Sequence, residues 1–167
     1  MQDGGLHAAR AFYRALSSPL ELFPCLSISL RDTLMPVRIF KAYDFHRWAK
    51  SEGLTDAKLC KAAQEIESGL VNARLGGFLI KKRVGAEGRG KRGGYRTIVA
   101  HRQGDCLVFL HGFDKNDKDN ISPREKKALH KLGDYYMTFT DAALSKAVRD
   151  GGIIEVRCHE QDPQECT

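Results

Sequence analysis

The sequence predicts an α+β domain: a small antiparallel sheet, two N-terminal helices on one of its faces, and further helices after it. Three observations support this prediction. Segments with the pattern of strands occur close together at residues 78–84, 94–102 and 106–113, and the last of them is nearly all apolar. Segments with apolar residues at the 3.6-residue helical spacing flank these predicted strands on both sides. The chain has 167 residues, 42% of them hydrophobic, which is enough for one domain with a sizeable core.

The first 34 residues differ from the rest of the chain in their sequence pattern. They show no clear periodicity and contain turn-prone points at Gly4-Gly5, Ser17-Ser18-Pro19 and Pro24. We therefore expect residues 1–34 to be an irregular and dispensable extension. Residues 35–157 should form the domain, and residues 158–167 a polar tail.

Two helices are predicted before the sheet. A short alternating strand starts at Met35, and a helix over residues 44–50 follows it. Thr55 is suited to cap a second helix, which Gly69 should end. The apolar residues of that second helix follow the 3.6 period: Leu59, Ala63, Ile66 and Leu70.

Two more helices and a strand are predicted after the sheet. Ser122 precedes a proline and stands three residues before Glu125, which is the pattern of a capping box. A further helix over residues 140–149 should stop at Gly151-Gly152, before a last strand over residues 153–157. The residues expected in the core are Trp48, Leu59, Ile66, Val99, Val108 and Leu110.

The positive charge of the chain is concentrated in residues 78–102. This segment has eight basic side chains against one acid, Glu87, a net charge of +7, whereas the whole chain carries +6. The basic residues are Lys81, Lys82, Arg83, Arg89, Lys91, Arg92, Arg96 and Arg102. Because the segment also has the pattern of a hairpin, a sheet and a short loop should display the charge. A local basic patch of this kind favours a phosphate-bearing partner, of which nucleic acid is the commonest.

Two motifs resemble ligand-binding loops but lack essential parts. Residues 85–91 have the glycine and lysine spacing of a nucleotide-binding P-loop, yet Arg92 replaces the hydroxyl residue and a strand follows in place of a helix. Residues 114–125 have acidic or amide residues at three positions of a calcium loop. However, Lys118 occupies a ligand position and Asp119 replaces the required glycine. We therefore expect no metal site and no cofactor.

The cysteines and histidines give weaker signals. The chain has five cysteines, an odd number, and no C-x-x-C pair, so we expect reduced thiols, with Cys60 and Cys106 buried. No apolar segment is long enough to span a membrane and no signal peptide is recognisable. The expected reduced thiols favour a cytoplasmic protein. His101 and His111 are expected to be neighbouring strand histidines, and His111 is the one considered for acid–base chemistry.

Two segments of the predicted sheet resemble a known family. GGYRTIVA at residues 93–100 and FLHGFDKN at 109–116 resemble the RelE/HigB-type toxins of bacterial type II toxin–antitoxin modules, in the RelE/ParE superfamily. The order of predicted elements agrees, and the resemblance covers about residues 35–156. It implies an endoribonuclease that cleaves mRNA, commonly on the ribosome, and so inhibits translation. It also implies a small antitoxin as partner, which in some modules has a helix-turn-helix.

The resemblance also suggests roles for single residues. The positions that match the family's catalytic cations are Lys81, Arg83, Arg96 and Lys115. The residues expected to bind RNA are Lys82, Arg89, Lys91, Arg92, Arg102 and Asn116. Better-known RelE toxins have an arginine and a catalytic tyrosine where this chain has Asn116 and Ser122, so the resemblance leaves the general acid and base open.

The chemistry of RNA cleavage fits a cluster of cations. Several positive charges around one phosphate stabilise the pentacoordinate phosphorane, and crowding favours the neutral form of a lysine. Lys81 or Lys115 is then a candidate general base, with Arg83 and Arg96 as clamps on the phosphate oxygens. Two alternatives remain: a non-catalytic toxin of the same fold, such as one that inhibits DNA gyrase, and a plain RNA-binding module.

Overall fold

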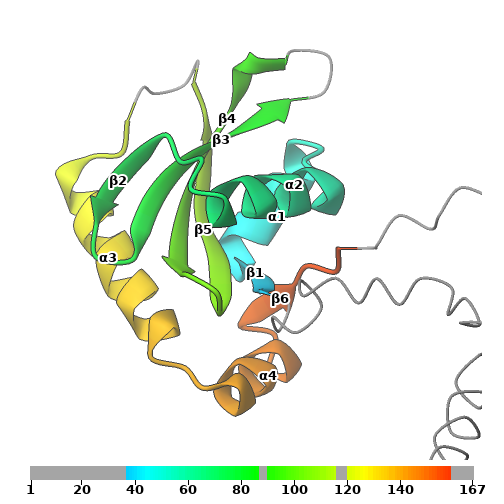
Figure 1. Cartoon of the computed structure of the whole chain (residues 1–167), viewed down its shortest axis with the longest axis vertical. Coiled ribbons are helices and arrows are strands. Elements are labelled where there is room, and N and C mark those ends of the chain that lie inside the picture. Colours follow the sequence, from blue (N-terminus) through cyan, green and yellow to red (C-terminus); the bar gives the residue numbers. More distant parts are fainter. Residues whose placement is uncertain (1–36, 87–89, 116–119, 159–167) are drawn as a thin grey trace, which may run out of the picture. The chain divides into compact units, whose positions relative to one another are not determined.

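The computed structural model describes residues 37–86, 90–115 and 120–158, including their side chains except those of 86 and 90–93. The predicted α+β fold is confirmed: helices cover a mostly antiparallel sheet with the strand order β2-β3-β4-β5-β1-β6 (Figure 1). In chain order, the elements are β1 (Arg38–Ala42), α1 (Tyr43–Ser51), α2 (Asp56–Glu67), β2 (Ala73–Gly76), β3 (Leu79–Ala86), β4 (Gly90–Arg102), β5 (Cys106–Asp114), α3 (Pro123–Met137), α4 (Asp141–Arg149) and β6 (Ile153–Glu155).

The centre of the sheet is a run of three antiparallel strands, β3, β4 and β5, which follow one another in the chain. The first strand of the domain, β1, lies beside β5 and runs parallel to it, and β6 pairs with the other edge of β1. The sequence patterns did not reveal β2, a four-residue strand that pairs with the outer edge of β3.

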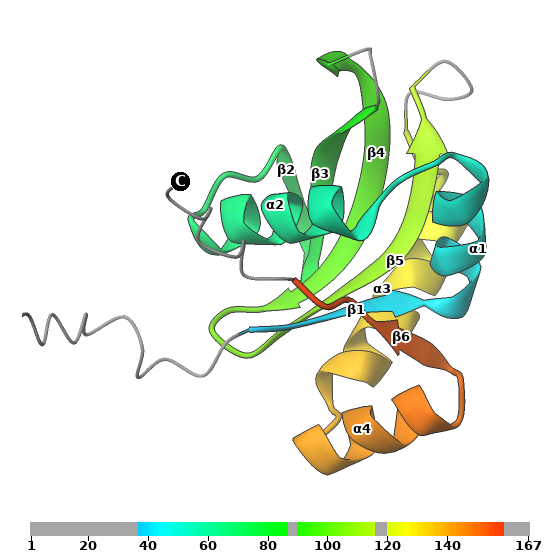
Figure 2. The same ribbon diagram turned by 90° about the vertical axis from the view of Figure 1, so that its right-hand side faces the viewer.

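Helices cover both faces of the sheet (Figures 1 and 2). On one face lie α1 and α2, and on the other lies α3, which approaches closely at Gly133. A Cβ atom at that glycine would lie 3.0 Å from Leu79 and 3.3 Å from Ala100. Beyond these helices, the ends of the β3–β4 hairpin and of β5 project from the domain in both views.

The helix ends mostly follow the sequence signals. The capping box at the start of α3 is confirmed, because Ser122 Oγ accepts from the Glu125 N–H and the Glu125 carboxylate accepts from the Ser122 N–H. The α2 helix ends at Glu67, earlier than expected, and Gly69 turns the chain with a φ of +81°. Leu70 therefore lies outside the helix and is 62% exposed, whereas the rest of the predicted stripe is buried.

The core forms largely from the residues predicted for it. Five of the six expected core residues are at most 4% exposed: Leu59, Ile66, Val99, Val108 and Leu110. The sixth, Trp48 on α1, is half-buried and packs against the core from its edge. Its indole lies over Gly112 of β5 and makes an edge contact with the ring of Tyr95. The six-membered ring of the indole occupies the space that a side chain at Gly112 would need.

Gly112→Ala is therefore expected to destabilise the domain. A Cβ atom at this position would lie 1.9 Å from Trp48 Cζ3, so either the indole or β5 must move. Overpacking of this kind typically costs about 1–3 kcal/mol of unfolding free energy. Urea unfolding followed by the fluorescence of the single tryptophan measures it. Gly152→Ala is the control, because its Cβ would be 3.6 Å from the nearest atom, and an equal loss there would contradict the account.

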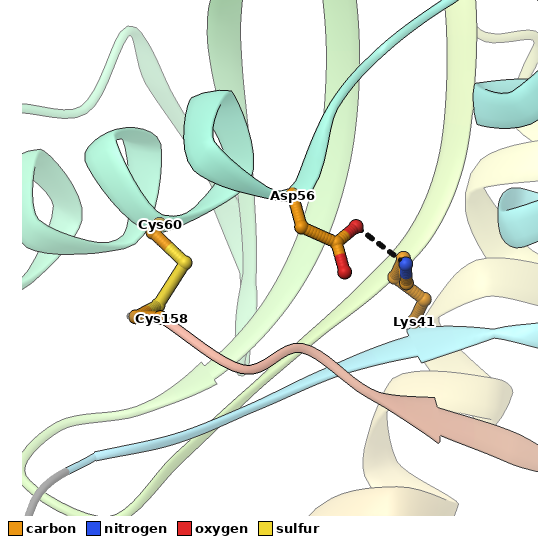
Figure 3. The surroundings of a disulfide bond; sticks show 4 residues. All are labelled: Lys41, Asp56, Cys60 and Cys158. Carbon is orange, nitrogen blue, oxygen red and sulfur yellow. Dashed lines mark hydrogen bonds and ion pairs between the residues drawn. A yellow bond between two sulfur atoms is a disulfide. The ribbon is translucent and has the colours of Figure 1, made fainter. Parts of the chain in front are cut away.

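The structure corrects the prediction for the cysteines. Cys60 of α2 and Cys158, which follows β6, form a disulfide across 98 residues (Figure 3). The two are far apart in the sequence, but the chain that leaves β6 passes beside α2. Among the described residues only Cys106 is a free cysteine; it is buried, and burial raises the pKa of its thiol. Cys25 and Cys166 lie outside the described residues, as does the expected extension 1–34.

Ion pairs also hold α2 on the sheet. The ammonium of Lys41, on β1, lies 2.6 Å from the Asp56 carboxylate at the start of α2 (Figure 3). At the other end of the helix, His101 of β4 contacts Glu67 at 2.5 Å. The expected pairing of His101 with His111 is wrong, because His101 lies opposite Leu107 in the β4–β5 register.

Candidate nucleic-acid interface

Five side chains from three strands share one face of the sheet, and we call this set the cation face. It consists of Lys81 and Arg83 from β3, Arg96 from β4, and His111 and Phe113 from β5. The register places them in two rows across the strands: Lys81, Ile98 and His111 in one, and Arg83, Arg96 and Phe113 in the next. Directly paired residues point to the same side of a sheet, so all of them face one way.

The sequence builds this face by simple alternation. Successive residues of β3 point to opposite sides, so Ile80 and Val84 go into the core beneath α1 and α2. The α3 helix covers the remainder of the cation-face side, around Leu79 and Ala100. The cation face therefore occupies the part of the sheet that lies beyond the closest approach of α3.

Lys81 reaches across the face from β3 toward β5. Its Nζ lies 5.8 Å from the centroid of the Phe113 ring, a cation–π distance. The same Nζ donates a hydrogen bond to Asn120 Oδ1 at 3.2 Å, just before α3 begins. The ammonium is thus held between the sheet and the segment that leads into α3.

Arg96 occupies the middle of the face. Its Cα lies opposite Arg83 on one side and opposite Phe113 on the other, and its side chain is only 6% exposed. Arg83 is exposed, and its backbone N–H donates to Asn72 Oδ1 at 2.7 Å. Lys115 is exposed directly after β5. Two arginines in one row can offer forked, bidentate hydrogen bonds to phosphate oxygens.

A family model for the RelE toxin of the RelE/RelB toxin–antitoxin system matches residues 37–156. This chain belongs to the RelE toxin family. The match covers the described domain from β1 to the end of β6, including every residue of the cation face. No curated protein and no solved structure matches the chain significantly. Membership of the family makes the chain the toxin of a toxin–antitoxin system and implies a cognate antitoxin.

Lys82 does not lie on the cation face of this toxin. Alternation sends it to the opposite side of β3, where it is 4% exposed beneath α2. Its Nζ lies 2.7 Å from Glu65 Oε2 and also donates to the carbonyl of Leu70. A lysine buried in this way stabilises the packing of α2, so the expectation that Lys82 contacts RNA does not agree with its position.

Arg102 is also used within the fold of the toxin. It stands at the far end of β4, away from the hairpin loop, and pairs with Asp105. The hydrogen bond to Asp105 raises the pKa of Arg102. Its guanidinium also donates to the carbonyls of Met137 and Phe139, just where α3 ends. These contacts stabilise the end of α3 and do not agree with the expected role in RNA binding.

The remaining RNA-binding candidates cannot be placed by their side chains. Lys91 and Arg92 belong to β4, in the part whose side chains are outside the description. Arg89 and Asn116 lie outside the described residues. Their roles remain predictions from the sequence.

Two residues of this region, Phe113 and Asn120, were not singled out in the sequence, and His111 was singled out only as a candidate for acid–base chemistry. Alternation within the predicted strand over residues 106–113 places His111 and Phe113 on one face, but only the register shows that this is the face of Lys81 and Arg96. Asn120 and Lys81 are 39 residues apart, and no pattern in the sequence predicts their contact.

Two further findings concern the described part of the chain. It contains no group of three or more histidine, cysteine or acidic side chains arranged to hold a metal ion. None of its helices is long and apolar enough to cross a membrane.

Proposed function

We propose that this toxin is an endoribonuclease that cleaves mRNA on the ribosome and thereby inhibits translation. The observation that carries the proposal is the cation face: Lys81, Arg83 and Arg96 project from adjacent strands toward one side of a rigid sheet. Such an array matches the charge of a phosphodiester and the still greater charge of its cleavage transition state.

The proposed chemistry is transfer of the phosphoryl group to the neighbouring 2′-oxygen. Arg83 and Arg96 hold the nonbridging oxygens, and their fixed charges offset the charge that develops on the phosphorane. Lys81 and Lys115 complete the set of cations. Because side chains supply the positive charge, we propose that the reaction needs no metal ion.

RNA binding is proposed to extend from the cation face along the β3–β4 hairpin. In the sequence, Arg89 precedes β4, Lys91 and Arg92 belong to the start of β4, and Asn116 follows β5. These residues would contact phosphates and sugars without fixing the reacting group. Lys82 and Arg102 are left out of the proposed interface because both are held in ion pairs within the fold.

Lys91→Ala is expected to weaken RNA binding with little effect on the rate of the bound complex. Removing one phosphate contact should raise the Kd and make the slope of log K against log salt shallower by about one unit or less. Fluorescence anisotropy with a short labelled RNA at several salt concentrations gives both quantities. Arg74→Ala, on the exposed edge strand β2, is the charge-matched control. An unchanged Kd and slope for Lys91→Ala would remove this residue from the interface.

The antitoxin is proposed to shield the basic side of the toxin in the bacterial cytoplasm. An acidic segment would meet the cation face by charge complementarity, since complementary potentials speed association and fix its geometry. Affinity purification of the toxin from its native host should therefore recover a small protein with an acidic segment. Replacing Lys81, Arg83 and Arg96 together by alanine should weaken that complex, and an undiminished affinity would place the antitoxin elsewhere.

The test of the function is cleavage by the purified toxin. Ribosomes with a defined mRNA, and the same mRNA alone, are incubated with the wild-type chain, and the products are separated on a sequencing gel. We expect cleavage at the A-site codon and far less on free RNA. If neither RNA is cut, although the toxin still arrests growth when induced, the nuclease proposal is wrong and a non-catalytic toxin replaces it.

A further inference from the structure

The cation face includes a histidine, His111, and imidazole is a side chain type suited to accept a proton at neutral pH. His111 lies on β5, directly across from Ile98 of β4, which in turn lies across from Lys81 of β3. The imidazole and the lysine therefore stand on the two strands that flank β4. Neighbouring strands are about 4.8 Å apart, so the backbones of these two residues are separated by roughly 10 Å.

The ring of Phe113 links the two groups. Its centroid lies 5.9 Å from the centroid of the His111 ring and 5.8 Å from Lys81 Nζ. Both functional groups thus converge on the same part of the face. Arg96 projects from the strand between them, one row further along, directly opposite Phe113.

In-line cleavage of RNA needs two proton transfers on opposite sides of one phosphorus. The 2′-hydroxyl loses a proton as its oxygen attacks, and the departing 5′-oxygen gains one. Two proton-transfer groups on either side of a phosphate-binding arginine provide this arrangement. We propose that His111 is the general base that activates the 2′-hydroxyl and that Lys81 is the general acid for the leaving 5′-oxygen. The proposal rests on the nuclease function proposed above.

The step is balanced without any other reactant. A ring nitrogen of His111 takes the 2′-hydroxyl proton while the bond from the 2′-oxygen to phosphorus forms. The bond from phosphorus to the 5′-oxygen breaks, and Lys81 Nζ gives that oxygen a proton. The products are a 2′,3′-cyclic phosphate and a 5′-hydroxyl, and exchange with solvent restores both side chains.

This assignment suits the ordinary acidities of the two side chain types. An unperturbed imidazole is mostly neutral at pH 7 and accepts a proton, whereas an ammonium group is charged and donates one. The chain thus needs no lysine with a strongly altered acidity to act as base.

The test compares normal mRNA with mRNA that carries sulfur in place of the 5′-oxygen at the cleaved linkage, in single-turnover reactions on programmed ribosomes. A thiolate leaves without protonation, so this substrate rescues the loss of an acid but not of a base. His111→Ala should slow cleavage of both substrates, by about 100-fold or more on normal mRNA. Lys81→Ala should be slow on the oxygen substrate and recover most of its rate on the sulfur substrate.

Two further variants separate proton transfer from a structural role. Added imidazole should partly restore the rate of His111→Ala and leave that of His46→Ala, a control histidine on α1, unchanged. His111→Gln preserves much of the side chain volume, but its amide cannot act as a base. We therefore expect it to be as slow as His111→Ala, which would show that the loss of rate does not come from a disturbed fold. Recovery of His111→Ala on the sulfur substrate, or wild-type rates for both His111 variants, would overturn the assignment. If the wild-type chain cuts neither substrate, the nuclease proposal fails and this assignment fails with it.

Discussion

Arg96→Ala is expected to lower the single-turnover cleavage rate by about 100-fold or more. Arg96 extends from the middle of β4, with strands paired on both sides, so the sheet fixes its direction before substrate binds. A charge held in place toward the transition state costs no reorganisation during the reaction, and its loss affects the rate more than the affinity. The measurement is cleavage on programmed ribosomes with enzyme in saturating excess over RNA.

Controls must show that the lower cleavage rate of Arg96→Ala does not come from the change in net charge alone or from unfolding. Arg74→Ala removes the same charge from the opposite side of the sheet, because Arg74 pairs with Ile80, and should cleave at the wild-type rate. Since Arg96 is buried, Arg96→Lys provides a second variant that keeps the charge but loses the forked geometry, and thermal melting checks both. A folded Arg96→Ala variant that cleaves at the wild-type rate would contradict the catalytic role.

Loss of the Cys60–Cys158 disulfide is expected to cause the largest change in stability. The bond closes a loop of 98 residues, which includes almost the whole domain, and so restricts the unfolded chain strongly. The chain-entropy estimate for a loop of this size is about 4–5 kcal/mol of unfolding free energy, an upper range for real proteins. Urea unfolding of the wild-type chain with and without reductant measures it.

Cys158→Ser isolates the contribution of this bond. Cys158 is exposed, so serine costs little packing, and the variant should unfold at the same urea concentration with or without reductant. The cleavage rate should not change, because α2 lies on the face of the sheet opposite to the cation face. If reductant leaves the stability of the wild-type chain unaltered, the bond does not stabilise the domain.

The disulfide also bears on the proposed cytoplasmic location. Glutathione and thioredoxin keep most cytosolic thiols reduced. In such a compartment the toxin would have the lower stability that we expect in the absence of the disulfide. The ion pairs of Lys41 with Asp56 and of Lys82 with Glu65, and the contact of His101 with Glu67, would then still join α2 to the sheet.

The features that the sequence predicted are local ones. The strands β3, β4 and β5 follow one another through short connections, so alternation within each strand already separates the side chains of its two faces. The capping box at Ser122 involves residues only three apart, so it could also be predicted from the sequence. The positive charge of the hairpin could likewise be predicted by counting the charged residues of one continuous segment.

The features that it missed depend on distant contacts. The parallel pairing of β1 with β5 joins residues such as Arg38 and Cys106, and no short pattern specifies it. Lys82 and Arg102 were read as parts of a basic patch, but their partners come from α2 and from the end of α3. The register shift between Ile98 and Val99 changes which residues of β4 and β5 lie opposite each other, and alternation alone cannot predict it.

The most direct test of the central claim is to map the 5′ ends of cellular mRNA after the toxin is induced in a bacterial host. The account predicts growth arrest with new ends inside translated coding sequences. It also predicts that these ends disappear when translation initiation is blocked, or when Lys81, Arg83 and Arg96 are all replaced by alanine. Growth arrest by the wild-type toxin without any new mRNA ends would contradict the account and identify a toxin that acts without cutting RNA.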